Sequence, residues 1–94
     1  MTPLEILVAA KALIPDEERW WRGDVDNHQI ENYCPVTALS WAGRDAPSQN
    51  YALAVSALVK GINNRDVIDW NDSPHRTLAD IHAAFDRAIE ATRP

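Results

Sequence analysis

A cysteine stands where a helix is expected to begin, at Cys34 directly before Pro35. A thiol at a helix N-terminus has its thiolate stabilised by the helix dipole and by free amide groups, which raises its reactivity. A nucleophilic cysteine also needs a base, usually a histidine, and the chain offers His28, His75 and His82. The spacing alone does not select one of them. The other interpretation is a small buried hydrophobic residue, because free cysteine is among the most buried residue types.

A second polar group comes later in the chain, where Asp72, His75 and Arg76 follow Trp70-Asn71. These three side chains could face a ligand together. The alternative is structural, because Asn and Asp commonly hydrogen-bond to nearby backbone and fix turns. In that case Asn71 and Asp72 shape the start of the last helix while Trp70 fills the core.

A metal site is not expected. His82 and Asp86 are four residues apart and share one face of a predicted helix. One histidine and one carboxylate do not make a site, because zinc usually takes three or four protein ligands. The sequence therefore predicts neither a bound metal nor another cofactor.

Consecutive tryptophans precede an arginine at Trp20-Trp21-Arg22. Trp and Arg are enriched at the energetic centres of protein interfaces, so one tryptophan could anchor a partner. Alternatively, both cover the edge of the core. Acidic residues surround this segment and could dock on a basic partner or simply form a solvated surface. The acids concerned are Asp16, Glu17, Glu18, Asp24 and Asp26.

Local signals place four helices around these residues. Thr2 and Thr77 each begin a capping box, which predicts helices from there to about residue 14 and about residue 91. Pro35 predicts a helix that ends at Gly43, and another helix spans about 48–60, with Gly61 as its cap. Residues 67–70 could be a helical turn or extended, and residues 15–33 form a loop that could hold one helical turn.

The apolar residues of the outer helices recur every three or four positions, as in a helix with one buried face. We therefore expect a compact all-α domain of about four helices with one long irregular connection, spanning residues 1–94. The expected buried positions are Leu4, Leu7, Val8 and Ala12 in the first helix and Leu78, Ile81, Phe85, Ala88 and Ile89 in the last.

Composition limits the class of protein. The net charge is −5, and the nine Lys and Arg are spread along the chain, so a basic footprint for nucleic acid is not expected. One cysteine excludes an internal disulfide, which suits a reducing cytosol. No apolar run approaches the roughly 20 residues of a membrane span, and the N-terminus lacks the features of a signal peptide. We therefore expect a cytoplasmic protein without a membrane partner.

These motifs resemble a family of small uncharacterised proteins from bacteria, mainly actinobacteria, and their phages. The resemblance covers nearly the whole chain and rests on Tyr33-Cys34, Ala38-Leu39 and Trp70-Asn71-Asp72. It implies that Cys34 and the Trp-Asn-Asp turn lie together in space, and it suggests a phage or mobile-element origin. The family often has glycine where this chain has Thr37, so a close approach at that position is not carried over.

The sequence favours a binding protein over an enzyme, because no complete catalytic set is visible. The leading hypothesis is a small acidic interaction protein whose partner is a protein, and self-association is a further form of assembly. The alternative is a cysteine-dependent enzyme or small-ligand protein that uses Cys34 with Asp72 and His75. The candidate binding residues are Asp16, Glu17, Glu18, Trp20, Trp21, Asp24, Asp26, Trp70, Asn71, Asp72 and Arg76.

Overall fold

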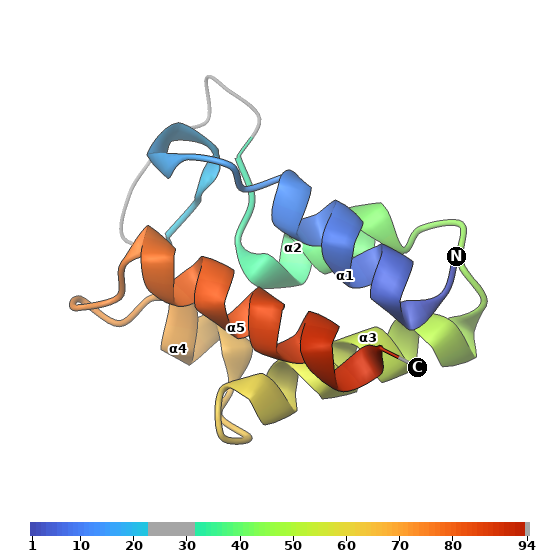
Figure 1. The fold of residues 1–94 in the computed structure, drawn as a ribbon. Coiled ribbons are helices and arrows are strands. Elements are labelled where there is room, and N and C mark those ends of the chain that lie inside the picture. Colours follow the sequence, from blue (N-terminus) through green and yellow to red (C-terminus); the bar gives the residue numbers. More distant parts are fainter. Residues whose placement is uncertain (23–31, 94) are drawn as a thin grey trace.

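The structure is a computed structural model that describes residues 1–22 and 32–93. The regular elements within these ranges are helices, so the fold is all-α, as predicted. Figure 1 shows α5 lying between α1 and α3, with α2 behind α1 and the short α4 below the start of α5. The elements are α1 (Pro3–Ala12), the 3₁₀ turn η1 (Glu17–Arg19), α2 (Pro35–Ala42), α3 (Ser48–Gly61), α4 (Val67–Asn71) and α5 (Leu78–Thr92).

Both predicted capping boxes are present at the starts of the first and last helices. Thr2 Oγ1 accepts from the Glu5 backbone N–H at 3.1 Å, and Glu5 Oε1 accepts from the Thr2 N–H at 2.8 Å. Thr77 and Asp80 make the equivalent pair at 3.2 and 3.0 Å. Each box satisfies amide groups that have no partner within the helix.

The capping hydrogen bonds also act on the two carboxylates. A backbone N–H bond from Thr2 holds the pKa of Glu5 below its usual value. The backbone N–H of Thr77 is the largest cause of the lowered pKa of Asp80. A lowered folded-state pKa means that the stabilising contribution is present above the ordinary carboxyl pKa and is lost as the pH falls through the lowered value.

The entrance to α2 also follows the sequence. Cys34 is the N-cap, with extended backbone angles of φ −82° and ψ 166°, and Pro35 is the first helical residue. Gly43 is the C-cap, as predicted. In the long connection before α2, the Asp16 side chain caps η1 by accepting from the Arg19 N–H at 3.0 Å. This turn is the helical turn that the sequence allowed there.

The core forms from one face of each long helix, and for α1 this face differs from the predicted one. Ile6, Leu7 and Ala10 are buried, whereas Val8 is 51% exposed and Ala12 is also exposed. A helix this rich in apolar residues has more than one apolar stripe, so its partners α2, α3 and α5 decide which stripe is buried. In α5 the buried residues are Ile81, Ala84, Phe85 and Ala88, close to the prediction.

The predicted cap at Gly61 is wrong, because α3 runs through Gly61 and has Ile62 as its C-cap. The turn beyond it is made by Asn63 and Asn64, both at φ 60°, a left-handed conformation that Asn tolerates better than most residues. Gly61 has a different role. A Cβ atom there would lie 3.2 Å from the Ala84 carbonyl oxygen, so glycine lets α3 approach α5 closely.

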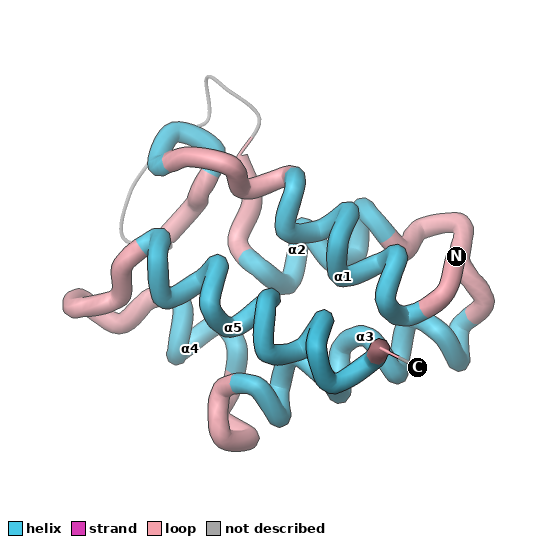
Figure 2. Tube along the Cα trace, viewed as in Figure 1, coloured by secondary structure: helices cyan, strands magenta, loops and turns pink. Residues whose placement is uncertain are grey.

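Two of the irregular connections lie at one end of the molecule. Figure 2 shows the chain around η1 and the connection between α4 and α5 at the same end, opposite the two termini.

The part of the chain that the structure describes contains no helix long and apolar enough to cross a membrane.

Candidate functional site

A buried asparagine joins the segments that gather at this end. Asn71 is 1% exposed, at the C-terminal end of α4. Its Oδ1 accepts a hydrogen bond from Trp20 Nε1 at 2.7 Å, and its Nδ2 donates to the Trp21 carbonyl oxygen at 3.1 Å. The same Nδ2 lies 3.1 Å from Asp72 Oδ1. Asn71 therefore fixes a segment 50 residues earlier in the chain.

Backbone hydrogen bonds add to these contacts. We call the set of contacts that links Asn71, Trp20, Trp21 and Tyr33 the joint. The Tyr33 N–H donates to the Arg19 carbonyl at 2.7 Å, and the Trp21 N–H donates to the Tyr33 carbonyl at 3.0 Å. These bonds form an isolated parallel bridge between Trp20 and Tyr33. Since Cys34 follows Tyr33 directly, the start of α2 is tied to the same joint. Tyr33 is thus linked through Trp20 to Asn71.

Two arginines, Arg22 and Arg76, pack on the tryptophan rings beside Asn71. Arg22 lies 5.3 Å from the centre of the Trp20 ring, and its Nη2 donates to the Ser73 carbonyl at 2.6 Å. Arg76 lies 4.3 Å from the centre of the Trp70 ring, and its Nε donates to the Trp70 carbonyl at 2.8 Å. Each arginine thus combines a cation–π contact with a backbone hydrogen bond.

The predicted binding residues divide into a buried and an exposed group. Trp20 and Trp70 are 7% and 5% exposed and fill the core. Asp24 and Asp26 lie outside the described residues. We call the described acids of this set, together with the half-buried Trp21, the acidic corner. It consists of Asp16, Glu17, Glu18, Trp21 and Asp72.

Cys34 is held at the start of α2 by its own helix. Its side chain is buried at 7% exposure. Thr37 Oγ1 lies 3.1 Å from the Cys34 carbonyl oxygen and 3.5 Å from Sγ, and it donates to both acceptors. Thr37 therefore packs against the cysteine.

We expect the Cys34 thiol to react slowly with a disulfide reagent in the native protein. Because Sγ is buried, labelling requires local opening, so the native rate should be at least about a hundredfold below the rate in concentrated urea. Ellman's reagent followed at 412 nm checks this by the known absorbance of its product. Native labelling as fast as in urea would contradict burial and favour the cysteine-dependent alternative.

Of the histidines that could serve as a base, His28 lies outside the described residues, whereas the structure describes His75 and His82. Within residues 1–22 and 32–93, no three His, Cys, Asp or Glu side chains lie close enough together to hold a metal ion. His75 is exposed, in the connection before α5. His82 Nε2 lies 2.6 Å from the Ile14 carbonyl, and Asp86 pairs with Lys11 Nζ at 2.7 Å. His82 and Asp86 therefore fasten the end of α1 to α5.

The fold brings together cations that are spread along the chain. Four of the nine Lys and Arg line one groove between α3, α4 and α5, namely Lys60, Arg65, Arg76 and Arg87. They are 27 positions apart at the extremes and come from separate elements, so no local run in the sequence marks them. Of the four, only Arg76 is among the predicted site residues.

One family model matches residues 1–91, that of a family of unknown function (DUF6197). The chain belongs to this family. The match spans every helix, from the cap of α1 almost to the end of α5, and so includes the joint at Asn71 and the acidic corner. No curated protein and no solved structure matches the chain.

Proposed function

We propose that this protein is a small binding module that acts through the acidic corner on a basic surface of another protein. The observation that supports the proposal most directly is the buried Asn71. Its hydrogen bonds hold Trp20 and Trp21, which directly follow η1, against the end of α4, where Asp72 stands. A satisfied buried polar network makes its surroundings rigid, so the exposed residues beside Asn71 are held in a fixed position for a partner.

The chemistry of the corner indicates the kind of partner. Glu17 and Glu18 are exposed at the start of η1, and Asp16 stands at its cap. Carboxylates in this arrangement attract a Lys- or Arg-rich patch and speed its approach. The half-buried Trp21 adds an apolar contact at the edge, the residue type that most often anchors an interface.

The biological setting belongs to the same proposal. The chain resembles proteins of bacteria and their phages, and a small acidic protein from such a source is well suited to bind a host protein in the cytoplasm. Self-association is a further form of assembly, for which the exposed Trp41 and Ile68, at 51% and 52%, offer apolar contacts. No contact in the described residues favours the cysteine-dependent alternative in the same way.

Reversing the charges of the corner should abolish partner binding. In Glu17→Lys/Glu18→Lys, two attractive carboxylates become repulsive ammonium groups, while the fold should be preserved because both side chains are exposed. The measurement is affinity capture from host cell lysate with quantitative mass spectrometry. One partner captured in stoichiometric amounts by the wild type should fall at least about tenfold in the variant.

The matched control is Asp45→Lys/Glu90→Lys, which makes the same change of net charge at exposed positions outside the corner. It should retain the partner. If both double variants lose the partner equally, the effect is one of total charge. If the corner variant retains it, the acidic corner is not the interface, and the proposal fails.

A further inference from the structure

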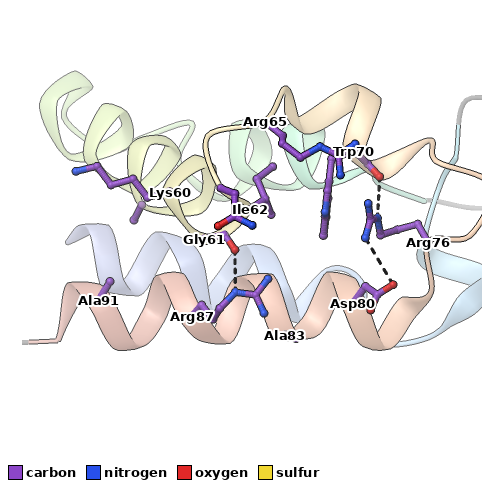
Figure 3. A pocket seen from close by; sticks show the side chains of 12 residues that line it. Lys60, Gly61, Ile62, Arg65, Trp70, Arg76, Asp80, Ala83, Arg87 and Ala91 are labelled. Atoms are coloured by element: carbon purple, nitrogen blue, oxygen red, sulfur yellow. Dashed lines mark hydrogen bonds and ion pairs between the residues drawn. The ribbon is translucent and has the colours of Figure 1, made fainter.

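A groove of about 700 Å³ runs along α5, outside the acidic corner. Its walls come from α3, from the turn after α3, and from α4 and α5, and Figure 3 shows its charged side chains on both sides. This size is within the range of small-molecule sites in proteins. Small residues keep the groove open on both walls, namely Ala57, Gly61, Ala83 and Ala91.

The groove has the opposite charge to the chain as a whole. Lys60, Arg65, Arg76 and Arg87 line it, and Asp80 is the acidic residue among its described lining. The local excess is three positive charges in a protein of net charge −5. In Figure 3 the Lys60 side chain points away from the three arginines, so the groove is a positively charged stretch beside α5, and such a stretch attracts anions.

Two of the cations are held in place by hydrogen bonds through Nε, and one of them also pairs with Asp80. Arg87 Nε donates to the Gly61 carbonyl oxygen at 2.8 Å. Arg76 Nε donates to the Trp70 carbonyl at 2.8 Å, and its Nη1 is 3.8 Å from Asp80 Oδ2, longer than a hydrogen bond. Each guanidinium is therefore oriented through Nε. The terminal N–H groups of Arg87 can bind a ligand at little further entropic cost, whereas a ligand at Arg76 would compete with Asp80.

The other two cations, Lys60 and Arg65, are not held by bonds to other described residues. The side chains of Lys60 and Arg65 make no hydrogen bond or ion pair with any residue in the described ranges. They lie on the side of the groove opposite Arg87, as Figure 3 shows. A ligand between the walls would thus meet the fixed guanidinium group of Arg87 from α5, that of Arg76 from the connection before α5, and movable cations from α3 and the following turn.

The lining also limits what such a ligand can be. Trp70 is buried, and Arg76 covers a face of its ring, so the indole does not offer a stacking platform for a base. Recognition must then come from charge and from N–H donors. Arginine forks bind phosphate oxygens in pairs, and a phosphate group carries close to two charges at neutral pH.

We propose that this groove binds a small phosphate compound with several negative charges, such as an inorganic or organic polyphosphate. The groove is larger than one phosphate group requires, and its three excess charges match a ligand with at least two phosphates. This site is separate from the acidic corner, so either proposal can fail without the other.

Calorimetric titration of the full chain with inorganic pyrophosphate at low ionic strength tests the proposal. Saturable one-to-one binding is expected, weakening as salt is added. Arg87→Gln should weaken binding about tenfold, because a hydrogen bond to a charged group is lost. Lys60→Gln/Arg65→Gln should weaken it similarly without harm to the fold, since neither side chain has a structural partner in the described residues. The control Arg44→Gln, outside the groove, should bind like the wild type.

Asp80→Asn provides a test in the opposite direction. It removes the negative charge from the groove and keeps an oxygen that can cap α5, so pyrophosphate should bind more tightly. ATP in place of pyrophosphate should bind if the site takes organic polyphosphates, and its failure would restrict the ligand to inorganic ones. No saturable binding, equal binding by the groove variants and the control, or equal affinity for citrate would overturn the phosphate assignment. Binding of an RNA oligonucleotide alone would overturn it as well.

Discussion

Replacing Asn71 with alanine is expected to lower the free energy of unfolding by about 3 kcal/mol. The substitution leaves the buried Trp20 indole N–H and the Trp21 carbonyl without their partner. Each buried polar group left unsatisfied costs about 1–3 kcal/mol. Urea unfolding followed by circular dichroism measures the loss. The total free energy of unfolding of a protein of this length is about 5–14 kcal/mol, so a loss of this size would be easy to detect.

Asn50→Ala is the matched control for this experiment. Asn50 donates an exposed hydrogen bond to the Met1 carbonyl, at 2.9 Å, so its loss should cost within about 0.5 kcal/mol. A second readout comes from partner capture, which Asn71→Ala should also weaken because Trp21 is no longer held. If Asn71→Ala and Asn50→Ala cost the same, the joint does not carry the energy assigned to it.

Replacing Phe85 with alanine is expected to cost about 3–5 kcal/mol of stability. Phe85 is fully buried on the face of α5 that packs against α1 and α3, in the centre of the core. The substitution removes the apolar contacts of a ring and leaves a cavity that the surrounding helices only partly fill. Thermal unfolding by calorimetry, with urea titration beside it, measures the effect.

Two companions make this result specific. Phe85→Leu keeps most of the apolar volume and should cost about 1 kcal/mol, well below the alanine variant. Leu53→Ala removes a similar apolar side chain that is 50% exposed, and it should change stability by about 0.5 kcal/mol or less. Equal losses in Phe85→Ala and Leu53→Ala would mean that the core does not centre on α5.

The helix starts could be predicted because their causes are local. Thr2, Thr77 and Pro35 each act within a few residues, so the signal in the sequence is complete. The buried face of α1 could not be predicted in the same way. Val8 and Ile6 are both apolar, and only the position of the neighbouring helices places Val8 outside.

The candidate site shows the same division between local and distant causes. The sequence singled out Trp20 and Asn71 by their types, but their hydrogen bond spans 51 positions and has no local signal. Lys60 and Arg87 looked like ordinary surface charges, because nothing near either residue indicates the other. The packing of α3 on α5, which Gly61 makes close, brings them to one groove. Interactions of this kind follow from topology, which a reading of local patterns does not supply.

The placement of the two chain ends has a practical consequence for binding experiments. Both ends lie at the side of the molecule opposite the acidic corner, as Figure 1 shows. A protein tethered to a sensor chip by either end would therefore display the corner outward. The groove differs, because Ala91 belongs to its lining and is three residues from the last residue of the chain. A C-terminal tether would crowd that opening, so immobilisation suits measurements on the corner, whereas the groove calls for untagged protein in solution.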